Sequence, residues 1–304
     1  MPPACPAEIH VCRYIRRQMH IEPYRPDEMG FAFCYHVYVR WHTWRRQPFA
    51  QLPTLDLTTA NTIAEQFGLR VLECAAQTSE VLLLLSLQPQ TSVSAAVGTL
   101  KGQISKWLNH NLGLEHPARL FGRGYFACTS GKSSSETVAA YLDSQGDHHG
   151  YASRVVPPVF VRSFPQGRDE HLQTDHAATL LQFHMVLATM CRKGVFGQTP
   201  GERVTDAWRS LEREFRFSLR KVSFVPDHVH VALQLHPAVA PAETVLALMN
   251  SAQETIASRC ELELIRAAIP RLWQPGAYVG SYGDLVSPKL AKYIQRYRGN
   301  QPTE

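Results

Sequence analysis

Apolar and polar positions alternate in two stretches that begin alike. YHVYVRWHTWRRQPF starts at residue 35, and FHMVLATMCRKGVF starts at residue 183. Each stretch has an aromatic residue, a histidine, an alternating apolar run, a basic pair and an apolar–aromatic end. Because successive side chains of a strand point to opposite faces, this alternation predicts a half-buried strand in both places.

The similarity continues along the chain. QTSEVLLLLSL (77–87) aligns with VPDHVHVALQL (225–235) at a spacing of 148 residues, the spacing that also separates residue 35 from 183. Helix-like segments follow both runs. RLFGRGYFACTSGKSSSETVAAYLDSQ (119–145) then aligns with RLWQPGAYVGSYGDLVSPKLAKYIQRY (271–297) without a gap, at a spacing of 152 residues. The change in spacing falls in a loop, where insertions are tolerated, so the chain is a tandem repeat.

Each repeat is predicted to run strand, helix, strand, helix, short strand or turn, and a final helix. Ser135 before Glu136, and Ser287 before Pro288, are good helix starts, because serine caps free backbone amides and proline fits the first turn. This order predicts an α+β fold of two tandem ferredoxin-like domains, with antiparallel sheets and helices packed on one face. The predicted boundaries are an N-terminal extension over 1–30, repeats over 31–150 and 177–304, and a linker over 151–176.

Length and hydropathy agree with two packed domains. The chain has 304 residues, 44% of them apolar, and its longest apolar run, Val81–Leu87, is strand-sized rather than membrane-spanning. Its first residues have no apolar core of signal-peptide length, so we expect a cytoplasmic protein of the bacterial cytosol or nucleoid, without a membrane partner. The 7 cysteines are odd in number and form no CxxC pair, which predicts reduced thiols rather than a disulfide framework or zinc knuckle.

Charge permits a nucleic-acid partner without requiring one. The net charge is +5, and basic residues alternate with aromatic ones at 13–18, 40–46 and 292–298. The candidate phosphate contacts are Arg45, Arg46, Lys101, Lys292 and Arg296. A solvated surface is the alternative for each of them. GKSSS (131–135) is not a nucleotide-binding loop, because Phe126 stands where such a loop needs a glycine.

His228 and His230 are the candidate metal ligands. Residues two apart in a strand point to the same face, so both imidazoles would project together from the sheet. That geometry suits a divalent cation, although two partly exposed histidines without a metal would give the same sequence.

PDHVHVALQL, followed by a serine-started helix that carries a tyrosine, resembles the single-tyrosine HUH transposases of the insertion-sequence 200/605 family. LKGQISKWL (100–108) is similar to that family's helix after the HUH strand, and YLDSQ (141–145) is similar to its catalytic helix. The resemblance covers both repeats. It implies Mg²⁺ or Mn²⁺ held by two histidines and a glutamine, single-stranded DNA as substrate, and a tyrosine that forms a 5′-phosphotyrosine and releases a 3′-OH. The DNA implied is the hairpin-containing end of a mobile element. A phenol, with a pKa of about 10, is a poor nucleophile near neutral pH, so a Lewis acid on the phosphate must assist it.

Neither repeat has the whole pattern. The first has Glu80 and Leu82 at the two histidine positions but keeps Tyr141 and Gln145, one helical turn apart. The second keeps its histidines and Tyr293 but has Tyr297 at the glutamine position. These losses are complementary. We therefore expect an intramolecular pseudo-dimer with one composite site made of four residues: His228, His230, Tyr141 and Gln145. A site with Tyr293 as nucleophile, or no catalysis, are the alternatives.

Three functions fit these features. The first is cleavage and rejoining of single-stranded DNA, in transposition or in a domesticated derivative. The second is a catalytically inactive protein that binds DNA hairpins or repeats by shape and by their unpaired bases. The third is a replication initiator or relaxase with the same chemistry, but such proteins resemble larger chains with further domains.

Overall fold

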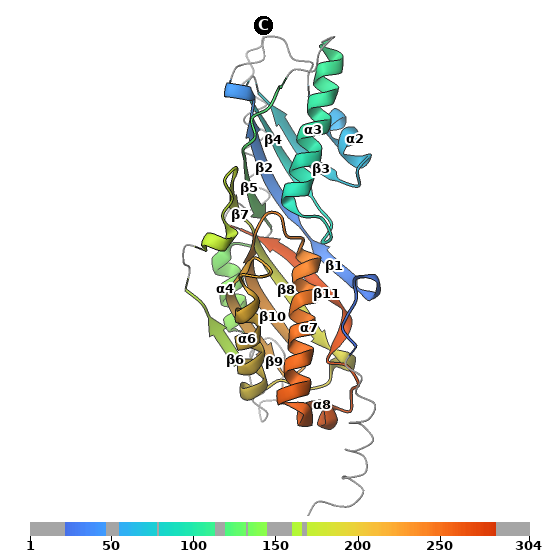
Figure 1. Cartoon of the computed structure of the whole chain (residues 1–304), viewed down its shortest axis with the longest axis vertical. Helices are drawn as coiled ribbons and strands as arrows, with labels where there is room; N and C mark the ends of the chain where they lie inside the picture. The colour runs from blue at the N-terminus through green and yellow to red at the C-terminus, as the bar shows by residue number, and fades with distance from the viewer. Residues whose placement is uncertain are drawn as a thin grey trace, which may run out of the picture.

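The computed structural model describes residues 22–46, 55–77, 79–112, 119–131, 133–144, 160–165 and 169–283. Two β-sheets lie one after the other along the long axis of the molecule, each with helices against it (Figure 1). Sheet B, the upper one in Figure 1, has the strand order β3-β4-β2-β5-β7, and sheet A has the order β1-β11-β8-β10-β9-β6. The predicted α+β architecture of two tandem domains is confirmed.

The first repeat supplies most of sheet B. Its elements are β2 (His36–His42), α2 (Leu57–Glu65), β3 (Arg70–Ala76), β4 (Glu80–Ser86), α3 (Val93–Asn111), β5 (Tyr125–Ser130) and α4 (Ser135–Asp143). The sequence pattern missed β3, which forms an antiparallel hairpin with β4. Helices α2 and α3 lie on one face of the sheet and bury its Val37, Val39 and Trp41 side.

Up to β11, the second repeat has the same order of elements, apart from the additional short helix α8. They are β7 (Ala177–Leu180), β8 (Gln182–Thr189), α6 (Gln198–Leu211), β9 (Phe217–Val225), β10 (His228–Leu235), α7 (Pro241–Arg259), the short α8 (Glu261–Ala267) and β11 (Trp273–Tyr282). Again the pattern missed the strand, β9, that pairs with the histidine-bearing β10. Helices α6 and α7 cover one face of sheet A (Figure 1).

The two repeats exchange the beginnings of their first strands. β1 (Gly30–Cys34) runs into β2 but pairs in parallel with β11 of the second repeat. In the same way, β7 runs into β8 but pairs in parallel with β5 of the first repeat. Where the strands cross, the Tyr35 and Phe183 rings meet edge to face, with centroids 5.0 Å apart. One hydrophobic cluster therefore runs through both repeats.

Two equivalent glycines allow the repeats to approach closely. A Cβ on Gly131 would lie 2.3 Å from the carbonyl oxygen of Ser281, and a Cβ on Gly283 would lie 2.5 Å from that of Thr129. The contacts are reciprocal, because Gly131 and Thr129 align with Gly283 and Ser281 in the repeat. The hydroxyl of Thr129 donates to the Tyr282 carbonyl at 2.7 Å, and that of Ser281 donates to the Ser130 carbonyl at 2.6 Å. The glycine of GKSSS thus serves packing between repeats.

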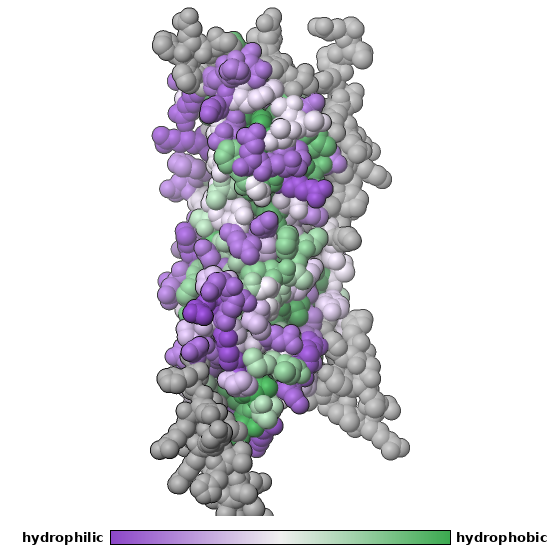
Figure 2. Space-filling view, turned by 90° about the vertical axis from the view of Figure 1, so that its right-hand side faces the viewer, coloured by the Kyte–Doolittle hydropathy of each residue, from purple (hydrophilic) through white to green (hydrophobic). Residues whose placement is uncertain are grey.

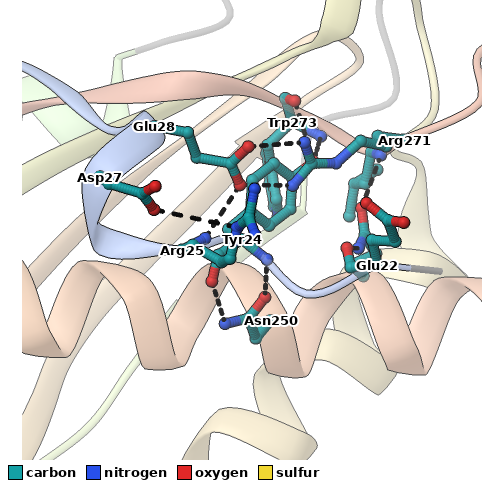
Figure 3. A network of polar contacts seen from close by, with 10 residues as sticks. Glu22, Tyr24, Arg25, Asp27, Glu28, Asn250, Arg271 and Trp273 are labelled. Atoms are coloured by element: carbon teal, nitrogen blue, oxygen red, sulfur yellow. Dashed lines mark hydrogen bonds and ion pairs between the residues drawn. The ribbon is translucent and has the colours of Figure 1, made fainter.

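The segment that was predicted as a linker contributes to the fold. β6 (Phe160–Ser163) pairs antiparallel with β9 and forms an edge of sheet A. Part of the predicted N-terminal extension packs as well, against the second repeat (Figure 3). Glu28 forms a two-pronged ion pair with Arg271 at 2.7 and 3.0 Å, and the Arg271 guanidinium lies 3.9 Å from the Tyr24 ring centre. The Tyr24 hydroxyl accepts from the Trp273 amide at 2.7 Å.

This network shifts the pKa values of Glu28 and Tyr24. The hydrogen bonds from Arg271 are the main reason why the pKa of Glu28 falls to about 2, while burial raises the pKa of Tyr24 to about 12.

On the face seen in Figure 2, hydrophobic side chains appear in patches separated by polar ones. None of the helices in the described ranges is long and apolar enough to cross a membrane.

Candidate active site

Helix α4 belongs to the first repeat but lies on the sheet of the second. Ser134 caps it by accepting from the Thr137 amide at 3.2 Å, one residue before the start expected from sequence. Its apolar side, Val138 and Leu142, packs with Ala232 of β10 and Tyr282 of β11. The helix therefore covers the face of sheet A opposite to α6 and α7.

A buried lysine fixes this docking. Lys221 of β9 is 8% exposed, and its ammonium donates to the Ala139 carbonyl at 3.1 Å and pairs with the Asp143 carboxylate at 2.5 Å. Both partners lie on α4. Because a charged group buried beside apolar side chains needs such partners, Lys221 ties the first repeat's helix to the second repeat's sheet.

The docking places Tyr141 over the paired histidines. His228 and His230 of β10 point to the α4 side of the sheet, and Val229 between them points into the core. The Tyr141 ring meets His230 edge to face, with centroids 5.4 Å apart. The two histidines are 3% and 4% exposed, whereas Tyr141 is 39% exposed. The tyrosine thus forms the solvent-facing side of a buried histidine pair.

A chain of hydrogen bonds runs through the histidines. The Nδ1 of His228 donates to the Asp227 carboxylate at 2.7 Å, and its Nε2 lies 3.1 Å from the Nε2 of His230. The Nδ1 of His230 lies 2.9 Å from the Nε2 of His184, which projects from β8 on the same face. Burial lowers the pKa of His184 to about 4, so this ring is neutral at neutral pH.

A strained backbone segment positions an arginine beside this chain of hydrogen bonds. Cys191 and Arg192, after β8, both have left-handed φ angles, 54° and 55°. Such angles are costly for residues other than glycine and tend to persist at functional sites. Here they bring Arg192 to the Asp227 carboxylate, with Nε 2.8 Å from Oδ2. Asp227 therefore holds His228 with one oxygen and Arg192 with the other.

The histidine pair fits a divalent cation. Two nitrogens bound to one ion at roughly 2.1 Å, in neighbouring positions of an octahedron, lie about 3 Å apart, and the two Nε2 atoms are 3.1 Å apart. Each ring uses its Nδ1 for a second partner, as metal-binding histidines ordinarily do. No group of three or more His, Cys, Asp and Glu side chains suited to a metal occurs among the residues that the structure describes. Within the described ranges, a third protein ligand would have to be of another type, and the predicted ligand Gln145 lies outside them.

Comparison with known proteins agrees with the two-repeat architecture. The sequence model of the family described as "Transposase IS200 like" matches residues 32–145 and 177–297, one match in each repeat. The chain belongs to the IS200-like transposase family. A solved structure from Deinococcus radiodurans R1 with a provisional transposase name is 20% identical to this transposase, over 44% of this chain and 98% of that chain, with a TM-score of 0.33.

A second solved structure has the provisional name of a glycine cleavage system transcriptional repressor. It is 8% identical, over 82% of this chain and 98% of that chain, with a TM-score of 0.18. The search of curated proteins found no match.

Several residues predicted for the transposase site lie outside the described ranges. They are Gln145, Lys292, Tyr293, Arg296 and Tyr297. Their roles stay predictions. Arg45 and Arg46 are exposed, and they follow the far end of β2, at least about 20 Å from the repeat crossing at Tyr35 by the rise of a strand. Both lie on the surface of the first repeat, and their role as phosphate contacts stays a prediction.

Lys101 has a structural role in this transposase. Its ammonium donates to the carbonyls of Gly122, Arg123 and Gly124 at 2.6, 3.1 and 3.0 Å. An ammonium has three N–H donors, so these bonds use the donors that a DNA phosphate would need. Burial lowers the pKa of this lysine to about 8.

The equivalent position in the first repeat lacks a pair of metal ligands. Leu82, at the position of His230, is fully buried in an apolar cluster with Tyr38 and Leu84. Glu80, at the position of His228, lies within ion-pair distance of Arg40 and His42. Among the described residues, the pair of histidines suited to a metal, His228 and His230, therefore occurs in the second repeat.

The sequence pattern missed several residues of the candidate site. These are His184, Asp227, Arg192 and Lys221. His184 had a visible signal, the aromatic–histidine start of both repeats, and Asp227 directly precedes the paired histidines. What the pattern could not supply was the strand register, which places His184 beside His230.

Proposed function

We propose that this transposase cuts and rejoins single-stranded DNA at one composite site, with Tyr141 of the first repeat as nucleophile and His228 and His230 of the second repeat as ligands of Mg²⁺ or Mn²⁺. The observation that carries the proposal is the position of α4: it brings Tyr141 within 5.4 Å of His230, ring centre to ring centre, across the repeat boundary. Gln145, four residues further along the chain, is the proposed third ligand.

The reaction transfers the scissile phosphate to the Tyr141 oxygen. The Tyr141 oxygen attacks the scissile phosphorus, the bond from phosphorus to the 3′ oxygen breaks, and the 5′ phosphate stays on the tyrosine. The phenol loses a proton and the departing oxygen gains one, which leaves a 3′-OH. When bound, a divalent cation supplies Lewis-acid polarisation of the phosphate. The covalent intermediate conserves the bond energy, so a second 3′-OH can reverse the step without ATP.

The surroundings support this assignment of roles. Asp227 orients His228, and Lys221 holds the tyrosine helix on the sheet. Tyr141 remains partly exposed, which leaves it open to a DNA strand. The proposed partners are hairpin-containing single strands, and Arg45, Arg46, Lys292 and Arg296 are the proposed phosphate contacts.

A covalent-capture assay tests the proposal. The full-length protein is incubated with Mn²⁺ and a pool of labelled single-stranded hairpin oligonucleotides, and protein–DNA adducts are separated on a denaturing gel. We expect an adduct that disappears with Tyr141→Phe and His228→Ala and persists with Tyr293→Phe. Loss with Tyr293→Phe alone would place the nucleophile in the second repeat. Binding of the hairpins without any adduct would favour the catalytically inactive hairpin-binding protein.

A further inference from the structure

We propose that His184 is a positioning residue, which accepts a hydrogen bond from His230 and thereby keeps the Nε2 of His230 unprotonated for the cation. The proposal rests on the cation site of the proposed function and adds a residue to it. His184 would not touch the cation or the DNA. It would act only through His230.

Of the two paired histidines, His184 contacts His230. Its Nε2 lies 2.9 Å from the Nδ1 of His230, and the two ring planes differ by 14°. This contact is on the side of His230 that faces away from His228, because the opposite nitrogen of His230 is the one at 3.1 Å from His228. His184 therefore controls the nitrogen that a bound cation would leave free.

Two proton arrangements satisfy this chain. In the first, the Nε2–H of His184 donates to the Nδ1 of His230, and the Nε2–H of His230 donates to the Nε2 of His228. In the second, the Nδ1–H of His230 donates to the Nε2 of His184. Each ring carries one proton in both arrangements, so the net charge does not change.

Only the second arrangement can hold a cation. In it, the Nε2 lone pairs of His228 and His230 face each other across 3.1 Å. Two facing lone pairs repel without a positive charge between them, so cation binding selects this arrangement. The hydrogen bond on the other nitrogen decides which tautomer a histidine adopts. A hydrogen-bond acceptor at position 184 is therefore needed for full affinity.

The first repeat provides a matched control. His36 occupies the position of His184 there, but Leu82 stands where the second repeat has His230. Leucine has no nitrogen to orient. A change at His36 thus alters the same strand position in a repeat that lacks the paired histidines.

The test is Mn²⁺ binding to the full-length protein, followed by the electron paramagnetic resonance signal of the free ion. His184→Met removes a strong acceptor, and His184→Gln has the same length but keeps a carbonyl oxygen. We expect His184→Met to weaken Mn²⁺ binding about 10–100-fold, His184→Gln to recover most of that loss, and His36→Met to stay within about twofold. Unfolding midpoints without metal check that each variant folds.

A second readout reports the tautomer itself. In ¹⁵N-histidine spectra with Mg²⁺, we expect His230 to be protonated at Nδ1 in the unchanged protein and to become a mixture in His184→Met.

The possible outcomes separate the two proposals. Equal Mn²⁺ affinity of the unchanged protein and His184→Met would overturn the role of His184 alone. The same conclusion follows if His36→Met weakens binding as much as His184→Met. If His230 of the Mg²⁺-loaded protein is protonated at Nε2, that nitrogen is not a ligand, which would overturn the cation site of the proposed function and this role with it. An unchanged protein that binds no Mn²⁺ would overturn the cation site of the proposed function, and this role with it.

Discussion

Gly131→Ala tests the closest contact between the two repeats. The added Cβ would lie 2.3 Å from the Ser281 carbonyl oxygen and 3.1 Å from the Tyr282 Cα. Both are backbone atoms, so no change of rotamer relieves the overlap. To reach an ordinary contact distance, β5 and β11 must separate by about 1 Å.

The cost follows from what this separation breaks. The bonds from Thr129 Oγ1 to the Tyr282 carbonyl and from Ser281 Oγ to the Ser130 carbonyl, 2.7 and 2.6 Å long, would stretch beyond hydrogen-bonding range. Each bond contributes about 1 kcal/mol, and overpacking a tight core costs about 1–3 kcal/mol. We therefore expect Gly131→Ala to lower the free energy of unfolding by about 3–5 kcal/mol.

Urea unfolding followed by tryptophan fluorescence measures the effect. Gly98→Ala and Gly102→Ala are the matched controls, because both glycines lie within α3 and a Cβ on either would meet nothing within 4 Å. Alanine is about 1 kcal/mol better than glycine inside a helix, so the controls should be slightly more stable than the unchanged protein. Adduct formation should fall with Gly131→Ala, since α4 begins just after this glycine. Stability within about 1 kcal/mol of the unchanged protein would refute the close approach.

Three further predictions concern charged side chains. Lys221→Met should lower adduct formation about tenfold, because α4 loses a charge-assisted anchor of about 1.5–3 kcal/mol. Asp143→Asn should lower it less, since the Asp143 side chain is 63% exposed. If Lys221→Met formed adducts as fast as the unchanged protein, other contacts would suffice to hold the helix. Lys101→Met should lower the free energy of unfolding by about 2 kcal/mol, because it leaves carbonyls without their donor, and it should not change the affinity for hairpin DNA. Unchanged stability together with weaker binding of hairpin DNA would instead support the predicted phosphate contact. Because the pKa of Glu28 is lowered to about 2, its pair with Arg271 should stabilise the fold fully above the ordinary carboxyl pKa near 4.5 and lose this effect as the pH falls toward 2. After allowance for solvent screening the difference is about 1–2 kcal/mol, and the pH dependence of unfolding between 2 and 5 should flatten in Glu28→Gln.

Much of the fold could be predicted from the local sequence. Spacing and alternation predicted the tandem repeat and the strands that start near Tyr35 and Phe183. They also predicted that the side chains of His228 and His230 lie on one face of their strand. The missed strands, β3 and β9, lie in stretches such as RVLECAA and FSLRKVSFV, where apolar residues face both sides. The alternation that marks a half-buried strand is therefore weak there.

The sequence by itself determined the two-repeat α+β fold, the transposase family and the residues from which a site could be built. Only the tertiary structure decided where these residues meet. Strand exchange and the docking of α4 depend on contacts between residues far apart in the chain, such as Lys221 with Asp143 and Gly131 with Ser281. The same applies to His184, which reaches His230 only through the register of β8 and β10. A local pattern records which face a side chain takes, but it does not record which distant segment will cover that face, because that choice depends on packing between segments.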